Sequence, residues 1–220
     1  SPIMSCLLQT VEDNNFKLCL KSLKCVMLMM EADADKFRSK TSVWAKKMLG
    51  RMSDNKSAVR EMATETAFRM VELYGTNFFY QHLVVPGFQH KKSKTREQIA
   101  ILVSKLANRL VSEESEISNN VLELVVDTLE DSAKEVREAA TRAIIELAPM
   151  YSDPEELVST LKSQIGFTIS QDIVDMILKE ALNSEREEKM EEDEEKMEED
   201  GEEKMEEDSE EKMDVAENAV

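Results

Sequence analysis

A pattern of about 40 residues recurs along the chain and constrains its fold more than any other feature. Each copy has a short polar break, then an anchor residue followed by a base, then a helical pattern. Aligning the anchors Phe16, Val59, Thr95 and Val136 gives successive spacings of 43, 36 and 41 residues. Behind each anchor, apolar residues recur at the i, i+3 and i+4 spacing of an amphipathic helix. The expected inward-facing sets are Cys19, Leu20, Leu23 and Met27, with Lys24 as a misfit at the remaining offset; Met62, Ala63, Thr66, Ala67 and Met70; Gln98, Ile99, Leu102, Val103 and Leu106; and Ala139, Ala140, Ala143, Ile144 and Leu147.

A second helical pattern precedes most of these helices. Apolar residues at helical spacing, which we call a stripe, recur over residues 37–52, 78–85 and 117–129. A fifth pair is predicted to begin at Asp153, because an Asp cap followed by Pro154 and two glutamates is a helix-start signal. Ser132 and Glu135 are expected to form a capping box. Five helix hairpins at this period are typical of HEAT or armadillo repeats. The sequence therefore predicts an all-α protein, an α-solenoid of about five HEAT-like hairpins over residues 1–183.

Such a stack determines where function can lie. One hairpin cannot bury its own apolar stripe, so neighbouring hairpins stack to form a continuous core. The turns that join the two helices of each hairpin then line up along one edge. We expect this edge to bind another protein's surface, rather than a cleft to bind a small molecule.

The acidity of the chain is concentrated after Asn183. The net charge is −18, and residues 184–220, with 20 acids and 5 bases, carry −15 of it. Glu, Lys, Met and Asp repeat there, with methionines at 190, 197, 205 and 213. Dense like charge opposes helix formation, so we predict a disordered, low-complexity acidic tail. Two roles stay open for it: solubility, or an electrostatic role in attracting basic partners or shielding a basic surface of its own domain.

Several functional classes have no support in the sequence. Neither a nucleophile motif nor a phosphate-binding glycine loop occurs, and His82 and His90 lack zinc-site spacing, so we expect no enzyme, catalytic residue, cofactor or metal site. The longest apolar run, residues 25–30, is far shorter than the ~20 residues that cross a bilayer, and no signal peptide is visible. Three cysteines, an odd count, fit reduced thiols in a cytosolic or nuclear protein.

A basic cluster, residues 90–96, precedes the third repeat helix and extends into its first turn. Cations are disfavoured at a helix start by roughly 0.3–1 kcal/mol each, so a binding role is expected where they gather there. The alternative is a solvated loop whose charges are balanced by neighbouring acids. Lys56 and Lys134 occupy other breaks and would lie on the same edge. Residues 1–183 carry a net charge of only −3, which argues against nucleic acid as the partner. An acidic protein surface fits these lysines better.

These breaks resemble those of a known family. The run Gln89-His90-Lys91-Lys92-Ser93-Lys94-Thr95-Arg96-Glu97, followed about forty residues later by Asp131-Ser132-Ala133-Lys134-Glu135-Val136-Arg137, resembles TOG domains, HEAT-repeat tubulin-binding modules, and most of all their CLASP and crescerin branch. The resemblance covers about residues 1–182. TOG domains have six repeats, against the five counted here, and their first loop commonly carries a Trp, for which Phe16 is the nearest candidate because Trp44 falls within a core stripe.

The resemblance implies a non-enzymatic domain that binds tubulin through its loop edge and regulates microtubule dynamics. We expect a cytoplasmic, cytoskeletal monomer, with a link to cilia through the crescerin branch. The candidate tubulin contacts are Phe16, Lys17, Lys56, His90, Lys91, Lys92, Lys94 and Lys134. Two alternatives remain: a general HEAT-repeat scaffold for another protein, and an acidic-tailed chaperone for basic proteins such as histones.

Overall fold

The computed structural model describes residues 2–113, 115–150, 159, 174–176 and 179. All regular structure within these residues is helical, as predicted. The predicted fifth hairpin, apart from a few isolated positions, and the predicted tail of residues 184–220 lie outside the described residues. Residues 2–113 and 115–150 belong to one compact unit.

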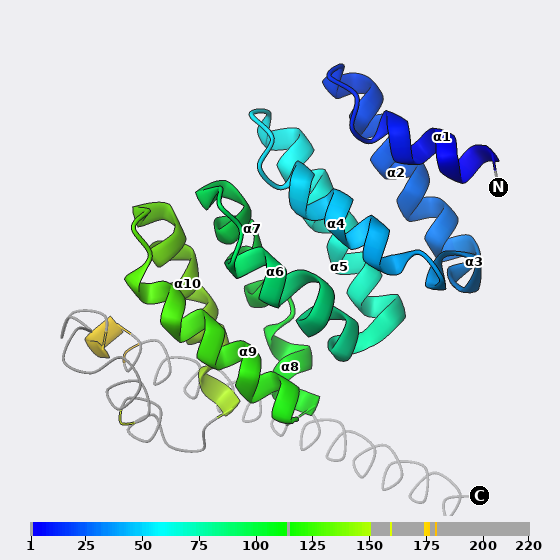
Figure 1. Cartoon of the computed structure of the whole chain (residues 1–220). Helices are drawn as coiled ribbons and strands as arrows, with labels where there is room; N and C mark the ends of the chain where they lie inside the picture. Colours follow the sequence, from blue (N-terminus) through cyan, green and yellow to red (C-terminus); the bar gives the residue numbers. More distant parts are fainter. Residues whose placement is uncertain (1, 114, 151–158, 160–173, 177–178, 180–220) are drawn as a thin grey trace, which may run out of the picture. The chain divides into compact units, whose positions relative to one another are not determined.

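The described helices form four hairpins that follow one another side by side in chain order (Figure 1). The first hairpin pairs α1 (Pro2–Thr10) with α2 (Phe16–Ala32), and the short α3 (Ala34–Arg38) follows it. The second pairs α4 (Thr41–Arg51) with α5 (Ser57–Phe79). The third pairs η1 (Tyr80–Val84) and α6 (Val85–Phe88) with α7 (Ser93–Lys105), followed by α8 (Ala107–Glu113). The fourth pairs α9 (Glu116–Asp127) and η2 (Thr128–Glu130) with α10 (Lys134–Leu147) and η3 (Ala148–Met150).

The helices pack in two layers, as the solenoid prediction requires. The second helices of the hairpins contact in sequence, α2 with α5, α5 with α7 and α7 with α10, while η1 contacts both α4 and α9 in the other layer. Trp44 on α4 is fully buried, 6.0 Å from the ring of Phe37. Thr95, the polar anchor of the third repeat, is also fully buried, and its hydroxyl donates to the Leu49 carbonyl at 3.2 Å. The core is therefore continuous across neighbouring hairpins.

The predicted register is wrong in the first repeat. When the repeats are aligned on the N-caps Asn15, Lys56, Lys92 and Ala133, Val59, Thr95 and Val136 are each the third residue of their helix, and their equivalent is Leu18 rather than Phe16. The buried residues of α2 are Cys19, Ser22, Leu23, Val26 and Met30, so Leu20 and Met27 are not the core positions that the sequence indicated.

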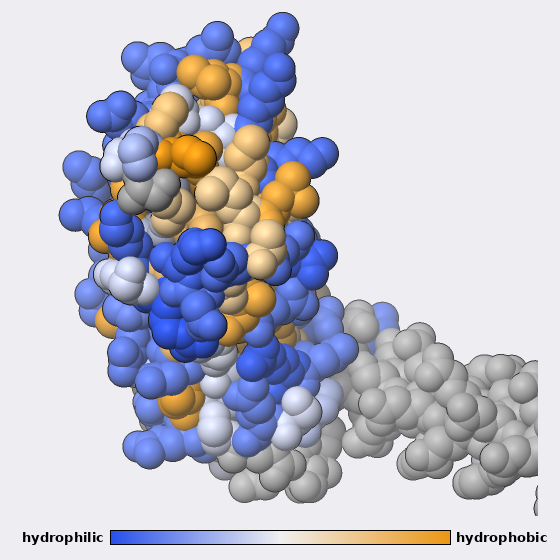
Figure 2. Space-filling model, turned by 90° about the vertical axis from the view of Figure 1, so that its right-hand side faces the viewer, coloured by the Kyte–Doolittle hydropathy of each residue, from blue (hydrophilic) through white to orange (hydrophobic). Residues whose placement is uncertain are grey.

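An exposed outer side of α2 explains this error. The third, tenth and fourteenth positions after the cap are buried in α5, α7 and α10, but in α2 they are Leu18, Cys25 and Met29, none of which is buried. Figure 2 views this end of the molecule, and apolar residues gather in its upper half. Among the described residues no helix packs outside α2, so burial there does not follow the pattern of the other repeats.

Local details also differ from the sequence predictions. The stripe over residues 37–52 is divided between α3 and α4, and α5 continues to Phe79 through Gly75, whose φ of +87° is left-handed. The capping box at Ser132 does not form. Ala133 is the N-cap of α10 without a side-chain hydrogen bond, and the Asp131 carboxylate instead accepts from the Ala133 amide at 2.8 Å.

Candidate functional site

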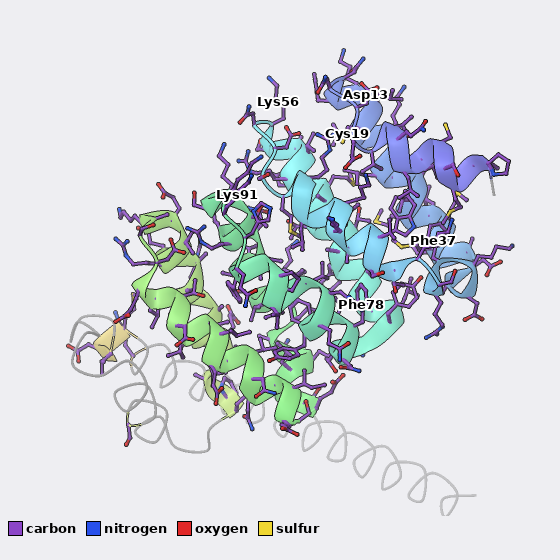
Figure 3. The ribbon with its side chains drawn as sticks, in the orientation of Figure 1. Asp13, Cys19, Phe37, Lys56, Phe78 and Lys91 are labelled. Carbon is purple, nitrogen blue, oxygen red and sulfur yellow. The ribbon has the colours of Figure 1, made fainter. Side chains whose placement is uncertain are left out.

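The four turns within the hairpins lie along one edge of the described stack. They comprise residues 11–15, 52–56, 89–92 and 131–133, and we refer to them together as the loop edge. Figure 1 shows all four at the same ends of the hairpins, and Figure 3 shows Asp13, Lys56 and Lys91 there. The predicted alignment of the basic turns on one edge is therefore confirmed for these residues.

An arginine at the same position in three repeats forms the same hydrogen bond to the backbone of its own loop. The base that follows each anchor, Arg60, Arg96 or Arg137, donates from Nη1 to the carbonyl oxygen six residues earlier, at 2.8, 2.8 and 2.7 Å respectively. Hydrogen bonds from a charged donor are stronger than neutral ones. The sequence shows the repeated base after the anchor but does not reveal its role. The structure shows that this base fixes the shape of each loop.

Other side chains tie neighbouring loops to one another. Arg51 donates to the carbonyl oxygens of Val11 and Asp13 at 2.6 and 3.1 Å, which connects the second hairpin to the first loop. Arg96 forms two hydrogen bonds to the Asp131 carboxylate, at 2.5 and 2.9 Å, which connects the third loop to the fourth. The Arg96 guanidinium holds the pKa of the Asp131 carboxyl below its usual value. The loop edge is thus cross-linked by polar contacts, which limits the ordering cost of binding.

Most predicted contact lysines are free of carboxylate partners. Lys17, Lys56, Lys91 and Lys94 are exposed and form no ion pair with any described residue. Lys134 differs, because its ammonium lies 3.1 Å from the carboxylate of Glu138 one helical turn later. The free positive charge is therefore concentrated at the second and third loops and in the first turns of α2 and α7.

Three loops bring Phe16, Lys56 and Lys92 together. The Lys56 ammonium lies 5.6 Å from the centroid of the Phe16 ring, within range of a cation–π interaction. Lys92 extends from the third loop and donates to the Ser53 hydroxyl at 3.1 Å. All three residues line an open hollow of about 380 Å³. Sequence analysis found the aromatic and the lysines, but it missed Arg51 and Ser53, which lie in the same hollow and have no distinguishing pattern.

His90 has a different place in the site from the lysines. Its Nδ1 accepts a hydrogen bond from the Lys92 amide at 3.2 Å, which shapes the third loop. Burial lowers the pKa of His90, and the neighbouring charges of Lys92, Lys91 and Arg96 lower it further. The ring is therefore neutral at pH 7 and adds no charge to the loop edge.

Among the residues that the structure describes, no group of three or more His, Cys, Asp or Glu side chains is placed to hold a metal ion. None of the described helices is both long enough and apolar enough to cross a membrane.

Known proteins resemble this chain in sequence. The family model of the XMAP215/Dis1/CLASP TOG domain matches residues 4–165. CLIP-associating protein 1 of Xenopus tropicalis is 23% identical over 137 residues, and CLIP-associating protein 1-A of Xenopus laevis is 22% identical over 137 residues. Each alignment covers 62% of this chain but only 9% of the relative, so this chain corresponds to a small part of those proteins.

Solved structures resemble it in fold. The N-terminal domain of MAST/Orbit superposes with a TM-score of 0.72 at 19% identity, covering 83% of this chain and 79% of that one. A structure of crescerin, which uses a TOG domain array to regulate microtubules in the primary cilium, gives 0.66 at 18% identity, covering 82% and 73%. These likenesses concern the fold, whereas the family match extends over most of the sequence. The chain therefore belongs to the XMAP215/Dis1/CLASP TOG domain family.

Proposed function

We propose that this chain binds tubulin through the loop edge and thereby regulates microtubule dynamics, without enzymatic activity. The observation that carries the proposal is the set of exposed, unpaired lysines on a cross-linked edge: Lys17, Lys56, Lys91 and Lys94. Family membership supports the same partner. One structural neighbour comes from work on TOG–tubulin binding specificity, with a TM-score of 0.61 at 18% identity.

The chemistry of the edge fits an acidic protein surface. Unpaired ammonium groups attract carboxylates, accelerate encounter and fix the register of a partner. The Phe16 ring, 39% exposed beside Lys56, offers an apolar contact at the centre of this charge. Lys134 contributes less free charge because Glu138 already engages it, whereas the neutral Ser53 hydroxyl holds the Lys92 ammonium in place without neutralising it. Phe16, Lys56, Lys91 and Lys94 are therefore the proposed principal contacts, with Lys17 beside them and His90 as a support for the third loop.

The test is co-elution of the full chain with purified tubulin at two salt concentrations. The informative variant is Lys91→Ala with Lys94→Ala, and the matched control is Lys21→Ala with Lys24→Ala. All four lysines are exposed and have no ion pair among the described residues, but the control pair lies on α2 away from the loop edge. We expect the loop-edge variant to bind roughly 3- to 10-fold more weakly and the control to bind like wild type.

Raising the salt concentration should weaken wild-type binding more than binding of the loop-edge variant, because fewer charges remain to be screened in the variant. Equal retention of both variants at both salt concentrations would show that the loop edge is not the contact surface. Failure of wild type to retain tubulin would favour the alternative of a scaffold for another protein. The same elution profile gives the stoichiometry, for which we propose one monomer of this chain.

The proposed cellular setting follows from the partner. A tubulin-binding chain acts at the cytoskeleton, and the likeness to crescerin makes the cilium one such place. Nucleic acid is not proposed as a partner, because residues 1–183 carry no net positive charge.

A further inference from the structure

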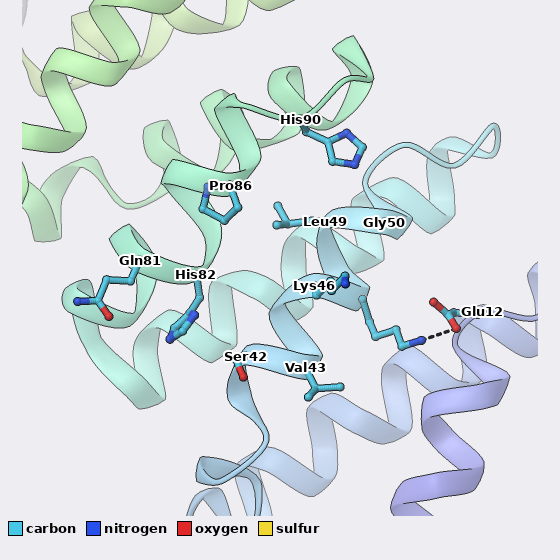
Figure 4. A pocket seen from close by; sticks show the side chains of 11 residues that line it. Glu12, Ser42, Val43, Lys46, Leu49, Gly50, Gln81, His82, Pro86 and His90 are labelled. Carbon is cyan, nitrogen blue, oxygen red and sulfur yellow. Dashed lines mark ion pairs between the residues drawn. The ribbon is translucent and has the colours of Figure 1, made fainter.

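A groove of about 1000 Å³ lies between α4 and the η1–α6 segment, in the layer of the first helices (Figure 4). Sequence analysis did not predict it, because its walls come from separate repeats and its residues share no motif. Its size is that of a site for a short stretch of another molecule.

The walls of the groove combine an apolar surface with a free cation. Val43, Leu49 and Pro86 line it; Val43 is 43% exposed, whereas Leu49 is buried, at 6% exposure. Lys47 forms an ion pair with Glu12 at one end. Lys46 is exposed and has no ion pair with any described residue. The groove therefore offers burial for an apolar side chain beside an ammonium group that lacks an anion.

The groove is also continuous with the loop edge. Gly50, near the end of α4, lines both this groove and the hollow that holds Phe16, Lys56 and Lys92. His90, from the third loop, lines the groove as well. A protein seated on the loop edge can therefore reach the groove with a short extended segment.

We propose that this groove binds an acidic peptide segment with an apolar anchor side chain, supplied by the protein that binds the loop edge. The inference rests on the proposed function for the source of the segment. Lys46 contributes the charge complementarity, and the accessible surface of Val43 and Pro86 receives the anchor.

The test uses a peptide of the right chemistry and no tubulin. A fluorescent peptide with the sequence of residues 187–200, which has ten acids and two methionines, is titrated with the full chain and followed by anisotropy. The protein variants are Val43→Ser and Lys46→Glu, with Leu18→Ser and Lys24→Glu as matched controls, exposed and outside the groove. A second peptide carries Met190→Ser and Met197→Ser.

We expect both groove variants and the serine peptide to weaken binding by about threefold or more, because each removes the charge or part of the buried apolar area. The two controls should bind the peptide like wild type. Loss of affinity in the groove variants separates the groove from the loop edge, and loss of affinity in the serine peptide shows that the peptide needs its apolar anchors.

The inference is overturned if the full chain does not bind the peptide, and also if the groove variants and wild type bind it equally. In a further variant of the full chain, Met190, Met197, Met205 and Met213 are changed to Ser. If only this variant binds the peptide, the groove binds the chain's own sequence, and the proposal that a partner supplies the segment is wrong. If tubulin is retained while the peptide fails, the groove inference alone is wrong. If the peptide binds and tubulin does not, the proposed function is wrong.

Discussion

Phe16 is the clearest example of a residue whose place in the structure differs from the one that its position in the sequence repeat predicts. It was aligned with the core anchors by its sequence position, yet it is the first residue of α2 and is 39% exposed. Its ring lies under the Lys56 ammonium, a contact between the start of α2 and the second loop that no local pattern reveals. Leu18, two residues later, has the same exposure but does not line the hollow.

This pair yields a matched test of the aromatic contact. Phe16→Ala should weaken tubulin binding by roughly 10-fold, because aromatic side chains at interface centres carry much of the binding energy. Leu18→Ala removes an equally exposed apolar side chain outside the hollow and should change affinity by less than about twofold. Tubulin titration by anisotropy measures both. Equal losses in the two variants would mean that the ring has no special place in the contact.

The Arg96–Asp131 contact predicts a pH-dependent stability. Asp131→Asn should lower the free energy of unfolding at pH 7 by about 1.5–3 kcal/mol, the usual contribution of charged hydrogen bonds. Because Arg96 lowers the pKa of Asp131 in the folded state, this contribution is fully present above the unfolded pKa of about 3.9 and is lost as the pH falls through the lower folded value.

Urea unfolding of wild type and variant between pH 7 and pH 3 measures the difference. The control is Glu130→Gln, an exposed acid of the same loop. A stability difference that stays constant down to pH 3 would contradict the assigned ion pair.

At the scale of elements, repetition made most of the fold predictable. Val59 and Val136 were recognised because four breaks share one pattern, and Trp44 because it falls in a helical stripe; all three are fully buried. In the first hairpin the sequence predicts only the second helix, and in the wrong register, because exposure of the outer side of α2 removes the constraint that shapes the other repeats; α1 is not predicted. The Arg51 and Ser53 contacts were not predictable, since they join residues about 40 positions apart.

Gly87 gives a prediction about packing between elements. It is buried on α6, and a Cβ there would overlap Ile99 of α7 and lie 3.2 Å from Cδ2 of Leu49 on α4. Gly87→Ala should therefore cost about 1–3 kcal/mol by overpacking. Gly50→Ala, where no atom lies within 4 Å of the new Cβ, should be neutral or stabilise helix α4 by up to ~1 kcal/mol. Thermal unfolding of both variants measures the difference, and an equally stable Gly87→Ala variant would contradict the close α6–α7 packing.

For the whole molecule, charge is divided along the sequence. Residues 184–220 carry −15 and residues 1–183 carry −3, so the lysines of the loop edge act within a chain whose overall charge repels an acidic partner. The loop edge itself was predictable from the solenoid, because stacking hairpins places their turns in a row. The groove beside it depends on the spacing of α4 and α6, which repeat periodicity does not determine.

Deleting residues 184–220 should therefore increase tubulin affinity, by roughly 2- to 10-fold at low salt and less at high salt, where charges are screened. Affinity is measured by titration at two salt concentrations. The chaperone alternative predicts the opposite behaviour: the deletion would abolish binding to basic proteins such as histones. Decreased tubulin affinity after deletion would mean that the acidic residues take part in binding.

The most direct measurement of the central claim is amide hydrogen exchange of the full chain with and without tubulin. We predict slower exchange in residues 11–15, 52–56 and 89–92, with a smaller effect in residues 131–133, where Lys134 is paired. The opposite ends of the hairpins, including residues 33–40 and 106–113, should exchange at unchanged rates. Protection of those opposite ends with no change along the loop edge would contradict the account.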